Sequence, residues 1–552
     1  GQPRSRRRLQ AEEAWRALLA GPPLPLIGEK IPEQLGTIAE RAMARDLYDR
    51  HAEARELAEE VHAWLEGVRR REEALRGVTG AEELLPEVRR LRAAVQRARA
   101  AADVALAEVQ SYDPVEKKLP GWRLEAEAAT AERRARQLEL EWVLQLRGTL
   151  NLDPELPEAH GRLADFYRDR LEEAELRRDP VLAEEAEALL RVHDRGQYAA
   201  WLQGDGHLSL ETQPSGAQVQ LFEVVDKDRR LEPVFIENLG ATPLRKILLP
   251  HGSYLLRITA PGRPMIAYPV QIERGQHWDG VAPGESHATP IQIPEKLDQD
   301  EIFVPGGWTR LGGDPDAAEG LPAQRWWIDS FVVQRYPVTN EDYCRFLNDL
   351  VDQGEDSKRW APAGLSTDAG HYHRDAKGHY HPQTDVLGRI WSPRSPVVMI
   401  SWNAAMAYAA WRAARDQKAW RLLHELEWEK AARGVDRRLQ PWGTPLEPTW
   451  TNVAGSRPGP PAWTAVEDYP SDESPYGVRG MAGNVRDWCA NAYSRSGAPG
   501  GGRLDPRAEA EAPLRMVRGG AWLSAAGSVR LCTRYADKPD ARLSSVGFRL
   551  AR

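Results

Sequence analysis

VRGGAWLSAAGSVRLCTRYADKPDARLSSVGFRLAR, residues 517–552, sets the architecture of the C-terminal half of the chain. Gly519 and Gly520 offer backbone freedom that only glycine gives without steric cost. Trp522 follows as a large apolar anchor, and residues 546–550 (VGFRL) are typical of a buried terminal strand. The residues between these fixed ends are mostly small or polar and show no clear period. The pattern predicts a rigid frame carrying an irregular loop, which is how binding surfaces are commonly built.

Nine residues of this loop are expected to point outward and to cluster into one ligand-binding patch: Leu523, Ser524, Ala525, Arg530, Arg534, Tyr535, Leu543, Ser544 and Ser545. A core would demand a consistent apolar face, and their chemistry is mixed. Tyr535 and Arg534 are the expected energetic anchors, since Tyr and Arg are enriched at binding hot spots. Trp522, Phe548 and the Gly519–Gly520 turn are expected to be buried scaffold.

The composition is that of a multidomain protein without a disulfide framework. A length of 552 residues is enough for three or four domains. The net charge of −8 argues against general nucleic-acid binding. Three cysteines, Cys344, Cys489 and Cys532, are too few for a disulfide scaffold. No apolar run is long enough to span a bilayer and no signal peptide is seen, so we expect a cytoplasmic protein without a membrane partner. The chain begins at Gly1 rather than Met, which is typical of a fragment or a processed product.

Several blocks before the tail carry a specific family resemblance. They are FVPGG at 303–307, YPVTN at 336–340, PVVMISW at 396–402, RLLHELEWE at 421–429 and GMAGNVRDW at 480–488. With RGG-x-W and GFRLAR in the tail, they resemble the formylglycine-generating enzyme (sulfatase-modifying factor) family. The resemblance implies that residues 297–552 form an elaborated C-type-lectin-like α/β domain rich in irregular loops. Leu423, His424, Gly480 and Arg486 depart from the family pattern.

The resemblance argues against the family's chemistry. Its enzymes oxidise a substrate cysteine with copper held by two thiolates, and thiolate is a soft ligand suited to Cu(I). Aligned from the tail, those two positions fall on Ser524 and Val529, and neither side chain supplies a thiolate. Arg486 stands where the family's cleft is lined by a tryptophan. A related group that holds iron through three histidines shows an H-x-x-x-H-x-E pattern, which this chain lacks. We expect no catalytic residues and no copper.

The same resemblance leaves a structural calcium ion open. Asn452, with the carbonyl of Val453, matches part of one family site, and Gly483, Val485 and Asp487 match part of the other. At position 480 a glycine replaces the usual carboxylate. Because calcium takes six or more oxygen ligands, its retention at one site is left undecided.

Residues 206–296 change character from helix to strand. Alternating runs such as 207–210 and 217–221 are separated by turn residues. The marks PSGA, GATPL, GSYL and PG at 214–217, 240–244, 252–255 and 261–262 resemble the small β-sandwich module called PEGA. Such modules imply partner binding rather than catalysis.

The first 205 residues are predicted to be helical. Apolar residues from Leu84 to Val109 and from Leu124 to Trp142 step by three and four, and breakers at Asp113-Pro114 and Pro120-Gly121 separate the two seams. Residues 68–205 are therefore expected to hold an antiparallel helical hairpin. A segment resembling a degenerate tetratricopeptide repeat, LNLDPELPEAHGRLADFY at 150–167, is expected to complete a helical adaptor.

Residues 1–67 resemble the last helices of the C-terminal lobe of bacterial serine/threonine kinases, through IPEQLGTI at 31–38 and AMARD at 42–46. The Gly-rich phosphate loop, the β3 lysine, the HRD loop and the DFG motif are missing from this chain. The predicted fold is thus a helical N-terminal half, a small β-sandwich, and a C-type-lectin-like formylglycine-generating-enzyme fold.

Four histidines, His371, His373, His379 and His381, form the remaining cluster, in GHYHRDAKGHYHP. Their alternate spacing places two on each arm of a hairpin turning at residues 375–378. Four imidazoles suit zinc, but a decorated surface hairpin is the preferred interpretation, since ligand spacing alone is weak evidence.

Three hypotheses follow. The first is a non-catalytic sensory or recognition region of a bacterial serine/threonine kinase-type protein, which binds a protein or a small ligand through its C-terminal domain. The second is a variable protein of a diversity-generating retroelement, since such proteins often end in this fold with hypervariable residues in the tail. The third is an oxidoreductase with a relocated metal site.

Overall fold

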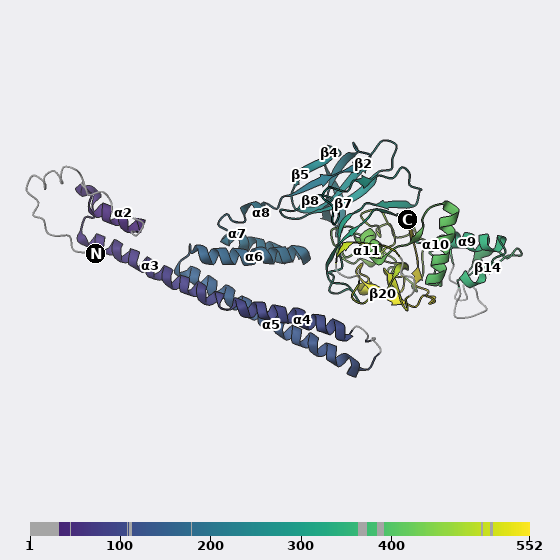
Figure 1. Ribbon diagram of the computed structural model, residues 1–552, viewed down its shortest axis with the longest axis horizontal. Helices are drawn as coiled ribbons and strands as arrows, with labels where there is room; N and C mark the ends of the chain where they lie inside the picture. Colours follow the sequence, from purple (N-terminus) through teal and green to yellow (C-terminus); the bar gives the residue numbers. More distant parts are fainter. Residues whose placement is uncertain are drawn as a thin grey trace, which may run out of the picture. The chain divides into compact units, whose positions relative to one another are not determined.

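The computed structural model describes residues 32–44, 46–106, 109, 113–177, 179–362, 372–383, 391–497, 501–507 and 512–552. The chain forms two compact units, Gly1–Ala199 and Ala200–Arg552 (Figure 1). The first is helical and the second is rich in strands, as predicted. The finer division at residues 67, 205 and 296 stays a prediction, and much of the kinase-like segment, residues 1–31, lies outside the described residues.

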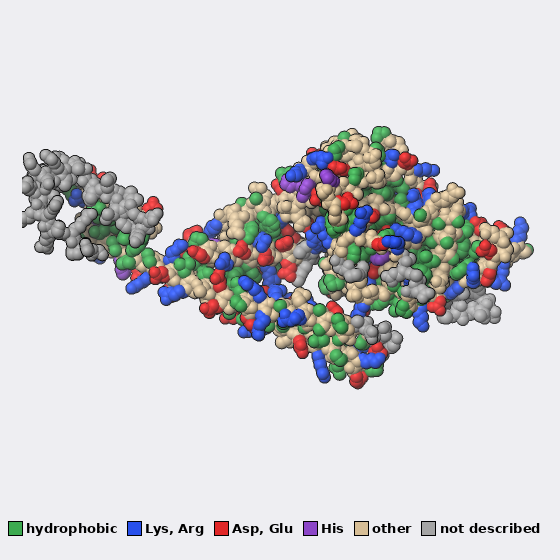
Figure 2. Space-filling view, viewed as in Figure 1, with side chains coloured by type: hydrophobic (Ala, Val, Ile, Leu, Met, Phe, Trp, Pro, Cys, Tyr) green, Lys and Arg blue, Asp and Glu red, His purple; other side chains and the backbone are tan. Residues whose placement is uncertain are grey.

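The described helices of the first unit are α2 (Glu33–Ala42), the short η1 (Leu47–Asp49), α3 (Ala54–Glu82), α4 (Leu85–Leu106), α5 (Val115–Leu152), α6 (Pro157–Arg177) and α7 (Pro180–His193). Helix α5 runs back along α4 as an antiparallel hairpin, since Arg92 pairs with Glu139 and Arg99 with Glu132. The predicted seam is buried at Val88, Val95 and Ala102 on α4, and at Ala128, Ala135, Leu138 and Trp142 on α5. Acidic and basic side chains alternate over the solvent face of these helices (Figure 2).

The predicted break at Pro120-Gly121 is wrong, because α5 continues through both residues. Pro120 is the sixth residue of α5, so the helix forfeits the one main-chain hydrogen bond that an N–H there would donate to the Glu116 carbonyl. Gly121 is buried against the partner helix, and a Cβ there would meet the Leu106 side chain at 2.3 Å. The glycine therefore permits close approach of the two helices rather than ending one of them.

In the second unit, helix α8 (Ala199–Gln203) precedes the strands β1 (Gly206–Leu210), β2 (Thr212–Gln213), β3 (Gln218–Lys227), β4 (Arg230–Ala241), β5 (Leu244–Leu249), β6 (Gly252–Thr259), β7 (Ile266–Ile272), β8 (His277–Trp278) and β9 (Ile291–Gln292). They form sheets of order β4-β3-β6-β7, β5-β1-β8 and β2-β9. Alternate residues of β1 and β3, including Leu208, Val219 and Leu221, enter one apolar core. The alternating sequence runs thus become half-buried strands, as expected.

Besides the two-stranded pair β14 (Tyr372–Arg374) and β15 (Tyr380–Pro382), the described part of the rest of the second unit is built on three more sheets. Their orders are β10-β13-β22-β16, β11-β12-β18 and β20-β19-β17-β21. The strands are β10 (Glu301–Val304), β11 (Gly307–Leu311), β12 (Gln324–Ile328), β13 (Phe331–Gln334), β16 (Arg421–Leu422), β17 (Arg486–Ala492), β18 (Gly502–Arg503), β19 (Arg515–Arg518), β20 (Arg534–Asp537), β21 (Val546–Gly547) and β22 (Leu550–Ala551). The terminal strand lies between β13 and β16, so the last residues of the chain close a sheet begun near residue 300.

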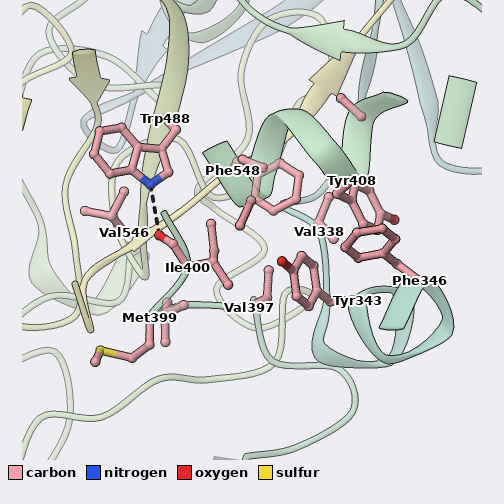
Figure 3. Close-up of a cluster of buried hydrophobic side chains, with 14 of the residues drawn as sticks. Val338, Tyr343, Phe346, Val397, Met399, Ile400, Tyr408, Trp488, Val546 and Phe548 are labelled. Atoms are coloured by element: carbon pink, nitrogen blue, oxygen red, sulfur yellow. Dashed lines mark hydrogen bonds between the residues drawn. The ribbon is translucent and has the colours of Figure 1, made fainter. Parts of the chain in front are cut away.

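Three helices pack on these sheets: α9 (Asn340–Asp352), α10 (Trp402–Asp416) and α11 (Glu425–Arg433), with 3-10 turns η2 (Lys358–Trp360), η3 (Pro448–Trp450) and η4 (Ala526–Ser528) between them. Thr339 and Ser401 cap α9 and α10 by accepting main-chain N–H groups. Tyr343, Tyr408 and Phe548 meet ring to ring in the core. The Trp488 indole N–H donates to the Ile400 carbonyl at 3.3 Å (Figure 3).

The sheets on either side of residue 297 contribute side chains to one common apolar core. Phe303 and Val332 belong to the same core as the β1–β7 strands. The Ser253 hydroxyl donates to Asp436 at 2.9 Å, and the Leu231 amide donates to the Trp442 carbonyl at 2.7 Å. The segment from 200 to 552 is therefore one compact body.

Helices α6 and α7 enclose a pair of buried histidines that makes a pH prediction possible. The Nδ1 atoms of His160 and His193 lie 3.1 Å apart. Burial, aided by His160 and the nearby arginines, lowers the pKa of His193 to about 4. The unfolded chain binds this proton near pH 6.5. Stability from this group is therefore full above about pH 6.5 and is lost as pH falls toward 4.

We expect the melting temperature of the helical signal to fall more steeply for wild type than for His193→Gln between pH 7 and pH 4.5, as measured by circular dichroism. His62→Gln, an exposed histidine on α3, is the control and should follow wild type. Equal pH slopes for wild type and His193→Gln would contradict the assignment.

Candidate functional site: the tail surface and its buried frame

One face of α11 carries charged side chains that are buried. Glu425, Glu429 and Arg433 repeat every four residues and so share a face. Glu429 accepts from Arg433 and from Arg518, both at 2.6 Å. Glu425 accepts from Arg534 at 2.7 Å and 3.0 Å. Each of these five side chains is at most 3% exposed, and buried charges persist only when they are paired in this way.

Strand pairing brings the two arginines of the tail to this helix. Arg518 on β19 stands opposite Arg534 on β20 in the antiparallel register. Two facing cations would repel each other without the helix carboxylates between them. Burial alone would raise the pKa of Glu429, but Arg518 and Arg433 hold it below its usual value. The block ELEWE and the tail are thus held together by ion pairs as well as by apolar packing.

A further buried ion pair, Asp487 with Arg549, completes what we call the frame, which consists of Glu425, Glu429 and Asp487 with their arginine partners. Asp487 accepts from Arg549 at 2.7 Å and from the Trp428 indole N–H at 2.8 Å, both through Oδ2. The Trp428 ring lies against Gly519, where a Cβ would come within 3.0 Å of it. Gly519 has φ of +93°, a conformation that side chains resist. The expected scaffold role of Gly519, Gly520, Trp522 and Phe548 is confirmed, since all four are buried.

The loop at 481–483 is held by an aspartate that the sequence did not single out. The Asp472 carboxylate accepts the main-chain N–H groups of Met481, Ala482 and Gly483 and the Thr451 hydroxyl. Burial raises the pKa of Asp472, while these donors oppose the rise. No local pattern marks this residue, because it acts from nine to eleven positions upstream.

The nine predicted patch residues divide into three groups. Leu523 and Ala525 are exposed, as expected, and Arg530, Tyr535, Leu543 and Ser544 are half-buried. Ser524, Ser545 and Arg534 are buried at 5%, 8% and 1% exposure, so the expectation that these three point outward is wrong. Arg534 belongs to the frame, because Glu425 holds it. Arg530 pairs with Asp314 and Asp316, at one side of the surface.

Arg486 gathers several patch residues into what we call the Arg486 cluster: Arg486, Ser524, Tyr535 and Ser545. Its guanidinium lies over the Tyr535 ring at 4.1 Å from the centroid. Its two terminal nitrogens donate to Ser524 Oγ at 3.2 Å and to Ser545 Oγ at 3.3 Å. Among the described residues no carboxylate pairs with it, and its Nε has no hydrogen-bond partner.

Tryptophans line the flank of this cluster. Trp391, Trp463 and Trp522 follow one another with ring centroids 5.3 Å and 5.1 Å apart. The indole N–H groups of Trp463 and Trp522 both donate to the Ser544 carbonyl, at 2.8 Å and 3.0 Å. These two hydrogen bonds therefore fix the backbone at Ser544 and, with it, the position of the neighbouring Ser545.

The residues named for calcium are already engaged with protein groups. The Val453 carbonyl accepts from Ser456, and the Gly483 carbonyl accepts from the Val485 amide. Asp487 is the sole carboxylate of the set, and Arg549 neutralises it. In the described ranges no three His, Cys, Asp or Glu side chains gather to hold a metal. The set is a poor fit for calcium, and calcium binding stays a prediction.

All three cysteines are buried and free of disulfides. Burial raises the pKa of Cys344 to about 12 and also raises the pKa values of Cys489 and Cys532. Thiolate formation is therefore disfavoured at each. Val529 and Ser524, at the positions expected from the resemblance, are buried as well.

The histidine hairpin forms from β14 (Tyr372–Arg374) and β15 (Tyr380–Pro382). The His373 and His381 rings stack at 5.1 Å, while His379 and His381 contact Asp352 and Asp375 separately. His371 lies outside the described residues. Tyr372 and Tyr380 face the core, so the hairpin is anchored by its tyrosines.

The Asp487–Arg549 pair predicts a large stability effect. Arg549→Met should destabilise the second unit by roughly 3–5 kcal/mol, because it leaves a buried carboxylate uncompensated. Urea unfolding followed by tryptophan fluorescence measures this cost. Arg507→Met is the matched control, since Arg507 also pairs with an aspartate, Asp505, but in solvent. It should change stability by about 0.5 kcal/mol or less. Equal effects of the two changes would contradict the role of the buried pair.

Residues 287–552 match the family described as "Sulfatase-modifying factor enzyme 1-like domain". The formylglycine-generating enzyme of Thermomonospora curvata is 30% identical over 311 residues, which cover 48% of this chain and 96% of that enzyme. Treponema denticola variable protein 1, a solved structure, is 18% identical, with a TM-score of 0.32 over 46% of this chain and 94% of that one.

The serine/threonine-protein kinase Pkn1 of Chlamydia trachomatis is 26% identical over 397 residues, or 70% of this chain. That share exceeds the stretch from 287 to the end, so the similarity extends upstream of residue 287. The chain spans about half, 55%, of the length of that kinase. No described helix is long and apolar enough to cross a membrane. Given the match over residues 287–552 and the near-complete coverage of an enzyme at 30% identity, the chain belongs to the formylglycine-generating enzyme (sulfatase-modifying factor) family.

Proposed function

We propose that this chain is a non-catalytic recognition region of a bacterial serine/threonine kinase-type protein, and that its C-terminal domain displays the binding surface. One observation carries the proposal. Buried ion pairs hold the C-terminal fold together, whereas the positions that the resemblance aligns with the two thiolates hold Ser524 and Val529. An intact frame without the metal-ligating groups is suited to binding rather than to oxidation.

The kinase assignment draws on the similarity upstream of residue 287, which a stand-alone enzyme of the family would not share. In this proposal the α3–α7 helices are an adaptor and the β1–β9 strands a PEGA-like partner-binding module. The proposal keeps the cytoplasmic location that the sequence leads us to expect.

The exposed part of the tail supplies the surface. Leu523 is 44% exposed and Ala525 is also exposed, while Tyr535 and Leu543 are half-buried. Leu523 lies in a turn in which the Ser524 amide donates to the Ala521 carbonyl, so part of the ordering cost of binding is met beforehand. A protein partner, or a small ligand with an apolar portion, fits this mixture of leucine, tyrosine and serine.

The test compares two exposed leucines of one body. Leu523→Arg should lower recovery of a specific partner from cells of the source organism by tenfold or more, while melting at the wild-type temperature. Leu248→Arg, on β5, is the control, because Leu248 is 58% exposed. The partner is identified by mass spectrometry, purified, and titrated against the three proteins. A partner bound equally by all three, or none at all, would contradict the proposed surface.

Oxidase activity gives a separate prediction. The copper-loaded chain should leave a cysteine-containing sulfatase-type peptide unchanged, because Ser524 and Val529 replace the two thiolates. Mass spectrometry of the peptide detects the aldehyde, and an active formylglycine-generating enzyme is the positive control. Aldehyde formed at the rate of that control would restore the oxidoreductase hypothesis.

The retroelement hypothesis uses the same surface. The expected hypervariable positions are Leu523, Ser524, Ala525, Tyr535, Ala541, Leu543, Ser544 and Ser545. A template repeat and a reverse-transcriptase gene beside the coding sequence would establish it, and it is compatible with a kinase-type protein.

A further inference from the structure

The Arg486 cluster consists of hydrogen-bond donors. A guanidinium has five N–H donors and no acceptor. One hydrogen on each terminal nitrogen goes to a serine hydroxyl, which leaves one on each that no described residue accepts. Ser524 Oγ also accepts the Ala521 amide at 3.1 Å. Both serine oxygens thus act as acceptors, and no described residue accepts from their own O–H groups.

The cluster also carries an unbalanced charge. The neighbouring buried arginines each have a carboxylate: Arg518 has Glu429, Arg534 has Glu425, and Arg549 has Asp487. Arg486 is next to Asp487 in sequence, yet that carboxylate is turned to Arg549 and Trp428. Arg486 is half-buried and stacks on Tyr535, so its charge is partly withdrawn from water while its edge can be reached.

Apart from the buried Nε–H of Arg486, four donors have no acceptor among the described residues: two terminal N–H groups of Arg486 and the O–H groups of Ser524 and Ser545. These donors surround one unpaired cation and so define the chemistry of the missing partner. A carboxylate offers two coplanar acceptors that match the fork of a guanidinium. The Tyr535 ring, over which the Arg486 guanidinium lies, supplies an apolar surface beside the charge. We propose that the Arg486 cluster binds the oxyanion of a ligand, a carboxylate or a phosphate ester, whose adjoining aromatic or aliphatic group lies against Tyr535. This deepens the proposed recognition function and rests on it.

The experiment uses the full chain and three fluorinated probes of one shape. 4-Fluorobenzoate carries a carboxylate, 4-fluorobenzamide is its neutral counterpart, and 4-fluorophenyl phosphate carries the other oxyanion. Ligand-observed fluorine NMR gives the dissociation constant of each. We expect at least one of the two anions to bind tenfold or more tightly than the amide, and the stronger of them indicates the ligand source.

Variants locate the binding. Arg486→Gln should weaken the anion at least tenfold, and Arg486→Lys should retain part of the affinity, because lysine keeps the charge but loses the fork. Arg257→Gln is the matched control: Arg257 is also half-buried and stacks on a ring, that of Phe222 at 4.3 Å, but in the β3–β6 sheet. It should bind the anion as wild type does.

Three results would overturn the anion site: equal affinities for the amide and both anions, an unchanged anion affinity in folded Arg486→Gln, or equal losses in Arg257→Gln. If Arg486→Gln fails to fold, two measurements still test the anion site. They are the affinities of wild type for the anions and for the amide, and the anion affinity of Arg486→Lys. A partner that depends on Leu523 but not on Arg486 would overturn the anion site alone and leave the recognition function standing.

Discussion

The buried ion pairs around α11 are the constraint on which the rest of the second unit depends. Glu425 and Glu429 bind arginines from β19 and β20, and Asp487 on β17 binds Arg549 at the end of the chain. A charge buried without its partner costs several kcal/mol, so the elements must come together in one arrangement or not at all. Short strands and long irregular loops, which have little regular hydrogen bonding of their own, can share a body because these pairs fix their positions.

Because these pairs fix the fold, loop positions such as Ser524 can change while the fold persists. Ser524 lies in a turn held by its own contacts to Ala521 and Ala454, and Ser544 is fixed from behind by two indole N–H groups. Substitution at the outer edge of the loop does not reach the Glu429 and Asp487 pairs. Arg486 shows the difference between the two environments. A fully buried arginine needs a carboxylate to neutralise its charge. Half-buried Arg486 contacts serine and tyrosine side chains instead, so its charge remains available to a ligand.

Much of this organisation could be predicted from the sequence. The Gly519–Gly520 turn, the buried Trp522 and Phe548 and the α4–α5 hairpin follow from steric and periodic rules. The single terminal strand expected over 546–550 is wrong in detail: the segment is buried, but it divides into β21, which pairs with β17, and β22, which pairs with β13 and β16. Arg534 was misplaced because its sequence neighbours are small or polar, and only the pairing of β19 with β20 brings it to Glu425. Asp472 and the Arg486 cluster depend on contacts between residues that are far apart in the sequence. Asp472 lies 21 residues from Thr451, and Arg486 lies 59 residues from Ser545. The periodicity of a sequence does not reveal such contacts. Pro120 was misread because its position within the first turns of α5 depends on where the helix begins.

Hydrogen exchange of the full chain, read by mass spectrometry, tests most directly the claim that a cooperative charged frame carries a separate displayed surface. Peptides from α11, β17, β19 and residues 546–551 should be protected together and should open with one common free energy. Peptides covering 523–528 and 538–544 should exchange orders of magnitude faster. Protection of the tail loop equal to that of the frame, or opening of α11 independently of β17 and β19, would contradict the account.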